Sequence, residues 1–564
     1  MYYKFSEFYA KELLILIEDN YKKIFKNSLE VLILQVMKSF LITASIFLGI
    51  CFIYILLMLS GTENNFTYVL DDAYIHLAMA KNFAFHGMWG ITEYSYSSSS
   101  SSPLFTFVLS ALIFIFGNHE LLPLIFNFGC TFFIIYFLNR YYSDLFKQNK
   151  SIVFTSIFTF LFASIHLLIF SGMEHVLQVL VFIINIYFFE KWRICDFKKS
   201  SYSAWFYCTL ALLGLIRFES MFYFLSLAFV FLLLRKFKQS GLLLFFGFLP
   251  VLVFCYFTYQ KTGYLLPNSV MVKGTKLDLT GDLLQQITDI ILYKLIKQPY
   301  FQLAAFFPLC LAAFLLFKDY KNKLTFHDIV LNNFLLIVLI FNLFIQAVFG
   351  QFTNFYRYEA YLLVGFSMVI IPKVKSLFVQ KNFLLQRYRI PVILIVLILM
   401  TLVLKVNLVN KLIITGSKNI YEQQIQSTRF LKKYYNNSKV VANDIGAICY
   451  FTDIHLLDVA GLGSKEMVPF KVKRKGLDDQ FEEFLKQFSA QNHYQLAIIY
   501  DEWLNGHVPK NWKKVAILKI KDVNAVLGRD HLSIYSVDPN IHYSLKQNVK
   551  SFHWNKNIQV KIIE

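Results

Sequence analysis

Long apolar runs separated by short basic clusters dominate the chain up to about residue 409. A helix that crosses a bilayer needs roughly 17–25 mainly apolar residues. The segment 103–117 is shorter, so we expect a half-helix or a re-entrant piece there. The remaining runs predict about eleven transmembrane helices, near 39–60, 121–138, 151–170, 173–190, 203–218, 219–235, 240–259, 298–317, 327–350, 355–372 and 390–409.

The basic clusters between these runs predict how the chain is oriented. They read "NRYYSDLFKQNK", "EKWRICDFKK", "RKFK", "KDYKNK" and "KVKSLFVQKNFLLQRYR". Lys and Arg are enriched in cytoplasmic loops. If all five clusters are cytoplasmic, the loops 61–102 and 260–297, the turn 351–356 and everything after about 410 lie on the outer face. The stretch 1–38 is charged and amphipathic, which predicts a cytoplasmic interfacial helix.

The pattern changes after residue 410. Helical patterns in "EQQIQSTRFLKKYY" and "DDQFEEFLKQF" alternate with the strand-like runs "KVVAND", "LAIIYD", "VAILKI", "LSIYSV" and "IQVKII". We therefore predict a polytopic α-helical membrane protein. Its transmembrane module covers 39–409, and an extracytoplasmic α/β domain covers 410–564.

Composition agrees with a membrane protein and narrows its partners. The chain is 57% hydrophobic and 16% charged, whereas soluble domains are roughly 45–50% apolar and about 25% charged. The net charge of +19 does not indicate nucleic acid, because the basic residues follow the spans. Their surplus in the C-terminal domain suits an anionic membrane surface or a phosphate-bearing substrate. The seven cysteines form no CxxC or pairing framework, and no metal ligands are predicted.

Two adjacent aspartates open a predicted helix in the first outer loop, within "YVLDDAYIHLAMAKN". One interpretation is that Asp71 and Asp72 cap this helix. The other is chemical, because Asp72 shares a helix face with His76 and Lys81 follows a few turns later. A carboxylate, an imidazole, a cation and nearby aromatic rings are the groups that a site for a sugar phosphate needs.

The second outer loop, "YQKTGYLLPNSVMVKGTK", contains Tyr264, Asn268 and Lys273. These side chains are candidates to line a cleft together with the first loop. The alternative is an ordinary loop with a turn at Pro267-Asn268.

Charged residues also stand at the ends of predicted spans. Glu174 lies in "SGMEHVL", Arg217 and Glu219 in "LIRFES", and Arg357 in "YRYEAY". Charges at membrane depth are costly, so they normally face partners or a cavity. A structural Arg–Glu pair and interfacial anchoring remain the alternatives.

Two polar segments have less specific patterns. The run Ser97–Ser102 is of low complexity and predicts a mobile loop. In the C-terminal domain, Asn443 and Asp444 precede a glycine in "NDIGAICY". No GxGxxG or P-loop motif is present, so these two residues either contact an acceptor glycan or cap helices.

The ordered motifs resemble those of GT-C membrane glycosyltransferases, in the branch similar to the mycobacterial arabinofuranosyltransferases. They are "DDAYIHLAMAKNFAFHGMWGI", "YSSSSSSPLFTFVLSAL", "SGMEHVL", "LIRFES", "GYLLPNSVMVK" and "RYE". The sequence departs from the family pattern in two places. The segment between the Asp pair and "SSPL" is shortened and rich in serine, and Phe218 stands where many relatives carry proline.

The resemblance implies an inverting transfer of a sugar from a polyprenyl-phosphate donor to a cell-envelope glycan or glycolipid, on the outer face of a bacterial inner membrane. Asp72 or Asp71 would be the general base. No cofactor is predicted, and a divalent metal is left open. An envelope glycan ligase or polymerase, a phosphoethanolamine-type transferase and a lipid-linked-sugar transporter are the alternatives. The donor would contact His76, Lys81, Glu174, Arg217, Glu219, Tyr264, Asn268, Lys273 and Arg357.

Overall fold

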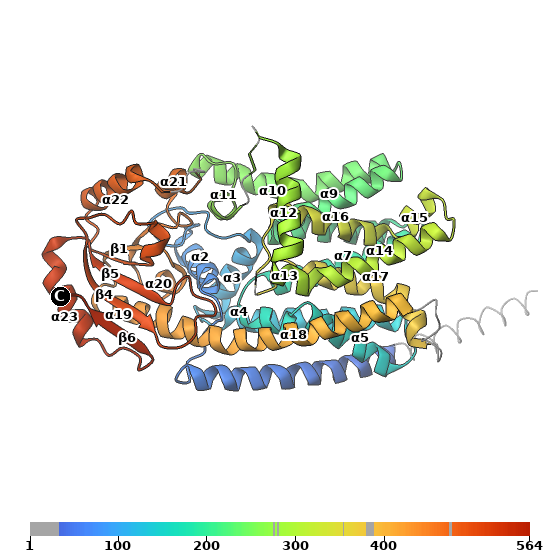
Figure 1. The fold of residues 1–564 in the computed structure, drawn as a ribbon, viewed down its shortest axis with the longest axis horizontal. Coiled ribbons are helices and arrows are strands. Elements are labelled where there is room, and N and C mark those ends of the chain that lie inside the picture. Colours follow the sequence, from blue (N-terminus) through green and yellow to red (C-terminus); the bar gives the residue numbers. More distant parts are fainter. Residues whose placement is uncertain (1–32, 275–276, 279–280, 354, 380–388, 473–476) are drawn as a thin grey trace, which may run out of the picture.

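The computed structural model describes residues 33–274, 277–278, 281–353, 355–379, 389–472 and 477–564. Long helices run side by side through most of the molecule, and a sheet with its own helices lies at one end (Figure 1). Most of the predicted interfacial helix, residues 1–32, lies outside the described residues. Residues 33–38 belong to the first long helix, Ile33–Gly61.

The predicted apolar segments coincide with helices. In chain order, the helices from the first outer loop to residue 262 are α2 (Asp72–His86), α3 (Pro103–Phe116), α4 (Leu122–Ser143), α5 (Asn149–Phe162), α6 (Ile165–Phe170), α7 (His175–Ile194), α8 (Ser200–Ile216), α9 (Ser220–Leu233) and α10 (Phe237–Thr262). The helices that follow, from the second outer loop onward, are α11 (Asn268–Lys273), α12 (Leu283–Lys297), α13 (Pro299–Phe301), η1 (Gln302–Phe306), α14 (Phe307–Lys321), α15 (Phe326–Asn332), α16 (Phe334–Phe349), α17 (Ala360–Val379) and α18 (Arg389–Ile420).

Helix breaks reduce the number of spans that can be assigned by length. Among the described residues, six helices are long and apolar enough to cross a membrane, and a seventh span exists if α15 and α16, bent by 80°, form one. Helix α5 stops at Phe162 because Ser164 takes a left-handed conformation with φ of 54°. Helices α8 and α9 are separated by Arg217, Phe218 and Glu219. The expectation of about eleven spans is therefore not confirmed as a count.

Helix α3 has the length expected for a half-helix. Its 14 residues extend about 21 Å at 1.5 Å per residue, which is less than the roughly 30 Å hydrocarbon core of a bilayer. Pro103 occupies the first turn, where its missing N–H leaves no bond unmade. The helix packs on α2, and so holds the first outer loop against the helix layer.

The C-terminal part forms a mixed six-stranded sheet in the order β2-β1-β3-β5-β4-β6. Strand β1 pairs in parallel with β2 and β3, and the other pairs are antiparallel. The strands are β1 (Lys439–Ala442), β2 (His455–Asp458), β3 (Leu496–Ile499), β4 (Lys513–Ile520), β5 (His531–Ser536) and β6 (Ile558–Ile562). All five predicted strand-like runs are strands.

Helices cover this sheet and join it to the rest of the chain. Helix α18 continues to Ile420, so the expected boundary between residues 409 and 410 falls inside it. The remaining elements are η3 (Tyr421–Ile425), α19 (Gln426–Tyr434), α20 (Gly446–Phe451), α21 (Val468–Val472), α22 (Asp479–Gln491) and α23 (His542–Ser551), with short turns of 3-10 helix between some of them.

The two faces of the sheet pack in different ways. Successive side chains on a strand point to opposite faces, so Val440 and Ala442 join the large apolar core that extends through the long helices. Val441 points the other way, into a separate core with Phe481 and Leu485 of α22. The sheet is thus fixed to the helices by a continuous apolar interface.

Candidate active site beside helix α2

A cavity of about 400 Å³ lies beside α2, between α11 and the chain segments around residues 217–222 and 349–358. Both polar and apolar side chains line it. The polar lining comprises Asp72, His76, Ser99, Ser101, Arg217, Glu219, Ser269, Lys273, Gln351, Arg357 and Tyr358. The apolar lining includes Ile75, Met173, Phe218, Met221, Phe222, Leu266, Val270, Met271 and Phe349.

Asp72 is paired with two cations in this cavity. Its Oδ2 accepts a hydrogen bond from Arg357 Nη1 at 2.9 Å, and its Oδ1 lies 3.9 Å from Lys273 Nζ. Burial raises the pKa of Asp72, but the charges of Lys273 and Arg357 outweigh burial and hold the pKa well below its ordinary value. The side chain of Asp72 is 26% exposed, so a charged carboxylate faces the cavity.

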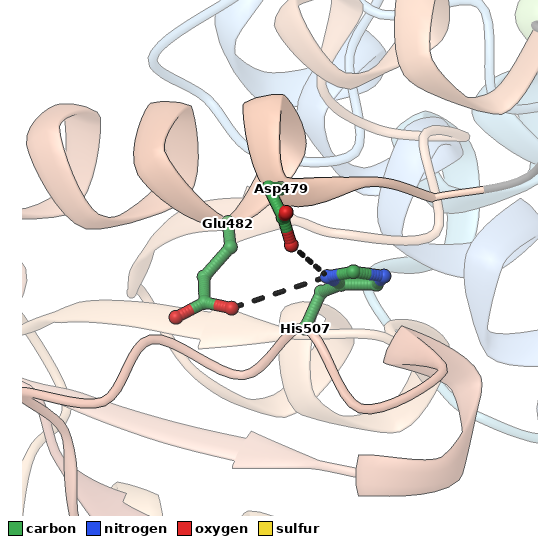
Figure 2. Close-up of side chains that lie close together, drawn as sticks. All are labelled: Asp479, Glu482 and His507. Atoms are coloured by element: carbon green, nitrogen blue, oxygen red, sulfur yellow. Dashed lines mark ion pairs between the residues drawn. The ribbon is translucent and has the colours of Figure 1, made fainter.

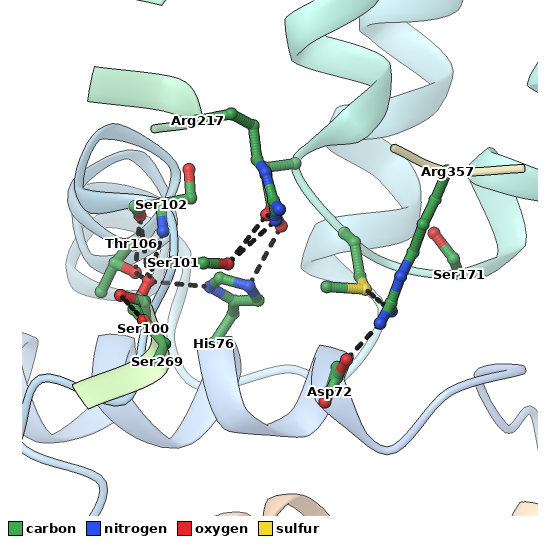
Figure 3. A network of polar contacts seen from close by, with 12 residues as sticks. Asp72, His76, Ser100, Ser101, Ser102, Thr106, Ser171, Arg217, Ser269 and Arg357 are labelled. Atoms are coloured by element: carbon green, nitrogen blue, oxygen red, sulfur yellow. Dashed lines mark hydrogen bonds and ion pairs between the residues drawn. The ribbon is translucent and has the colours of Figure 1, made fainter. Parts of the chain in front are cut away.

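Arg357 is held by contacts on three sides. Its Nη1 also lies 3.2 Å from Met173 Sδ, and its Nη2 donates to Tyr358 Oη at 3.0 Å. The guanidinium lies 4.9 Å from the centre of the Tyr358 ring. These contacts hold the planar group in place, and Figure 3 shows its hydrogen bond to Asp72.

A second ionic group surrounds buried Glu174. His76 Nε2 lies 3.0 Å from one carboxylate oxygen of Glu174, and Arg217 Nη1 donates to the other. Burial raises the pKa of Glu174, yet His76 and Arg217 keep it well below the ordinary value. Arg217 also pairs with Glu219, with Nε donating at 3.0 Å. Two carboxylates thus neutralise Arg217, and little positive charge is left for a ligand.

The serine run is buried and ordered by contacts, so the expectation of a mobile loop was wrong. Ser99 Oγ donates to Leu462 O at 2.9 Å, and Ser98 Oγ accepts from the backbone N–H of Asn268 at 3.0 Å. Ser100 Oγ lies 3.3 Å from His76 Nδ1, and Ser101 Oγ donates to Glu174 (Figure 3). A hydroxyl both donates and accepts, so adjacent serines can bond four different elements.

Asp71 points away from Asp72 and into the C-terminal domain. It does not cap its own helix. Its carboxylate accepts from the backbone N–H groups of Gly446 at 2.6 Å and Ala447 at 2.8 Å, at the start of α20. Burial raises the pKa of Asp71, and the bonds from these amides act in the opposite direction. Asp71 therefore docks α20 onto α2.

Four predicted donor-binding residues lie outside the cavity lining: Glu174, described above, and Lys81, Asn268 and Tyr264. Lys81 lies nine residues along α2 from Asp72, about 14 Å at 1.5 Å per residue, and donates to Tyr450 O at 3.0 Å. Asn268 is buried and donates to Leu462 O at 3.3 Å. The backbone N–H of Tyr264 donates to Thr262 Oγ1. Lys81 and Asn268 hold the C-terminal domain, because their helices pack directly against it.

The two weak acceptor candidates are internal to the C-terminal domain. Asn443 exchanges hydrogen bonds with the backbone of Tyr500, at 3.2 and 3.1 Å. Asp444 Oδ2 accepts from Gln424 Nε2 at 2.8 Å and from Tyr500 Oη at 3.0 Å. Burial and the neighbouring Asp71 raise the pKa of Asp444 well above its ordinary value. Neither residue lines the cavity.

Sequence reasoning missed several polar side chains of the cavity. Ser99 and Ser101 were hidden by their low-complexity context, and Ser269 and Gln351 carry no motif. Tyr358 was considered only as an interfacial anchor, although it follows Arg357 directly and supports its guanidinium. The signal for Tyr358 was its place between two charged residues in "YRYEAY".

One group of metal-ligand types occurs on the C-terminal domain. His507 Nδ1 lies 3.5 Å from Asp479 Oδ1 and 3.9 Å from Glu482 Oε2 (Figure 2). Asp479 and Glu482 occupy the first turn of α22, where acidic side chains complement the helix dipole, and the Asp479 side chain is fully exposed. These contacts are accounted for as surface ion pairs, and none of the three residues lines the cavity.

The sequence comparisons identify only part of the chain. Residues 418–535 match a family model described as "Domain of unknown function (DUF8728)". A search of curated protein sequences finds no match.

Solved structures of three glycosyltransferases are similar to this chain. ArnT from Cupriavidus metallidurans, in a crystal structure with bound undecaprenyl phosphate, is 11% identical, with a TM-score of 0.48 over 89% of this chain and 98% of that one. The archaeal oligosaccharyltransferase AglB from Archaeoglobus fulgidus, in complex with an inhibitory peptide and a dolichol-phosphate, is 12% identical, with a TM-score of 0.40 over 87% of this chain and 74% of that one.

The arabinofuranosyltransferase AftD from Mycobacteria is also 12% identical, with a TM-score of 0.40, over 88% of this chain and 41% of that one. All these TM-scores are below 0.5, so the chemistry of the cavity rests on the residues of this chain.

Proposed function

We propose that the chain is an inverting glycosyltransferase that moves a sugar from a polyprenyl-phosphate donor to a hydroxyl group of a cell-envelope glycan or glycolipid. One observation carries the proposal. A charged carboxylate, Asp72, and two cations, Lys273 and Arg357, meet in a cavity that apolar side chains also line. A base, a phosphate-binding pair and an apolar surface are what this reaction requires.

Lys273 and Arg357 are the phosphate-binding groups of the proposal. Lys273 is only loosely paired, at 3.9 Å from Asp72, and its side chain is 44% exposed, so it can turn toward a ligand. Arg357 presents a planar guanidinium that matches a phosphate. Arg217 is not part of this pair, because Glu174 and Glu219 already neutralise it.

Donor binding would activate Asp72. While Lys273 and Arg357 hold its pKa down, the carboxylate is a weak base. A donor phosphate that takes over both cations removes this effect, and the pKa of a desolvated carboxylate then rises. Asp72 becomes a competent base only when the donor is in place.

The transfer step follows from this arrangement. The acceptor oxygen attacks the anomeric carbon while its proton passes to Asp72. The bond between that carbon and the phosphate oxygen breaks, and its electron pair leaves with the phosphate, whose growing charge Lys273 and Arg357 offset. The lipid beyond the phosphate would lie along apolar side chains of the lining, such as Phe218, Phe222 and Leu266.

The proposed location is the outer face of a bacterial inner membrane. The basic clusters of the sequence support this orientation: in the described residues, α4, α7 and α9 each begin near the cavity and run into a basic cluster at their other end. Lipid-phosphate sugars are the donors available on that face.

The test uses undecaprenyl phosphate as a probe for the purified, detergent-solubilised protein. Lys273→Met and Arg357→Met should each weaken its binding, and Lys81→Met, outside the cavity, is the matched control.

Asp72→Asn should bind the probe as tightly as wild type or tighter, because it frees both cations, and yet lose transfer by roughly 10²–10⁴-fold. Transfer is read by mass spectrometry of envelope glycans from a deletion strain complemented with each variant. Wild-type glycans in the Asp72→Asn strain would refute the catalytic assignment.

A further inference from the structure

Lys405 is a buried lysine that the proposed reaction does not use. It lies on α18, the last long helix, and its side chain is 0% exposed. Ionisable residues at membrane depth are rare and normally have a specific partner or function. The contacts of Lys405 therefore indicate what it does.

The Lys405 ammonium group joins two breaks in the helix layer. Its Nζ donates to Phe162 O at 2.7 Å, the carbonyl of the last residue of α5. Carbonyls at helix C-termini lack intrahelical partners and favour a nearby cation. The same Nζ lies 4.1 Å from the centre of the Tyr356 ring, a distance typical of a cation–aromatic contact.

Tyr356 has an unusual backbone that its surroundings must hold in place. It is fully buried and has a φ of 51°, a left-handed conformation that is unfavourable for a bulky side chain. The edge of the Tyr300 ring packs at 6.1 Å between centroids, and Lys405 covers the ring face. Among the described residues the Tyr356 hydroxyl has no hydrogen-bond partner, so the ring is the part that is held.

Arg357 is the next residue in the chain, and its guanidinium contacts Asp72. The left-handed turn at Tyr356 sets the direction in which the Arg357 side chain leaves the backbone. We infer that Lys405 is a positioning residue, which fixes the Tyr356 ring and thereby aims Arg357 at Asp72. The importance of this for transfer rests on the proposed function, but the positioning itself does not.

The experiment measures the reactivity of Arg357 toward phenylglyoxal, an arginine reagent, by mass spectrometry of the full-length protein. Lys405→Met and Tyr356→Leu should each raise the labelling rate of Arg357 by about tenfold, as expected for the loss of a desolvated cation–aromatic contact. Tyr356→Phe, which keeps the ring, should leave it unchanged. Lys411→Met, at an exposed position on the same helix, is the matched control, and Arg217 serves as an internal reference.

In the double variant, Lys405→Met with Tyr356→Leu, Arg357 should be labelled no faster than in either single variant, because both substitutions remove the same contact. An unchanged Arg357 rate in Lys405→Met would overturn the inference, and so would an equal rise at Arg217, which would indicate general loosening. A second arm measures binding of undecaprenyl phosphate. Lys405→Met should weaken lipid binding when it is introduced into the wild-type protein, and should have no effect on lipid binding when it is introduced into the Arg357→Met variant. If the wild-type protein does not bind this lipid, the proposed function fails while the labelling result still decides on Lys405.

Discussion

Asp71 and Asp72 are adjacent in the chain, but their side chains act in different parts of the molecule. Asp72 faces Arg357 and Lys273 in the cavity, whereas Asp71 accepts the first amides of α20. The sequence predicted both as candidate bases. It did not separate them, because the partner of Asp71 lies 375 residues away in the chain and no local pattern reports such a contact.

The position of Asp71 gives a prediction for domain docking. In Asp71→Asn the two amides of α20 face a weaker acceptor, and stability should fall by about 1–3 kcal/mol. Transfer by the folded protein should persist, because Asp71 does not line the cavity. Thermal unfolding in detergent, together with the glycan readout, checks both parts. A folded Asp71→Asn protein without transfer would contradict this division of roles.

Gly446 provides a second test of the same contact. A Cβ on this residue would lie 2.2 Å from the backbone oxygen of Asp71, so Gly446→Ala cannot be accommodated without moving α20. We expect a loss of about 1–3 kcal/mol, measured by thermal unfolding. The control is Gly241→Ala, which should be nearly neutral because Gly241 has open space around it. Gly506→Ala would be a poor control, because Gly506 has a positive φ.

At the scale of elements, the sequence predicted secondary structure well and helix breaks poorly. The periodicity of the five strand-like runs was sufficient, because the sheet buries alternate residues on two different cores. Strand β2 was not among the predicted runs. The break at Arg217–Glu219 agrees with the predicted boundary between the spans 203–218 and 219–235, and it brings Arg217 and Glu219 to the cavity. The break at Ser164 falls inside the predicted span 151–170, and apolar run length alone does not show it.

The loop after β2 links the sheet to the cavity and predicts a pH effect. Asp458 is fully buried and accepts from the backbone N–H groups of Ala460 at 2.7 Å and Gly463 at 2.6 Å. Burial raises the pKa of Asp458 to about 6, so the folded protein holds this proton more tightly than the unfolded chain. The contribution to stability is therefore full below the ordinary pKa near 3.8 and declines as pH rises to about 6.

Asp458→Asn should remove this decline. Between pH 4.5 and pH 7 we expect the stability of the variant relative to wild type to rise by about 2 kcal/mol. Thermal unfolding at the two pH values measures it, with Asp538→Asn, at an exposed turn cap, as the control. A difference between variant and wild type that is the same at both pH values would count against a raised pKa.

At the scale of the whole molecule, the sheet and α15 lie at opposite ends of the helix layer (Figure 1). If the sheet is extracytoplasmic, α15 is near the cytoplasm. In a cysteine-free background, Val523→Cys, in the C-terminal domain, should react with a membrane-impermeant maleimide in intact spheroplasts, and Phe326→Cys, on α15, should react only after permeabilisation. Both side chains are exposed. The reverse pattern would place the cavity in the cytoplasm and refute the proposed donor.

The serine run has a consequence for how such proteins can be recombined. Its hydroxyls contact His76 on α2, the backbone N–H of Asn268 and the backbone oxygen of Leu462 in the loop after β2. A chimera that exchanges the C-terminal domain alone would leave these hydroxyls facing foreign partners. A graft of the C-terminal domain therefore needs to carry residues 97–102 with it.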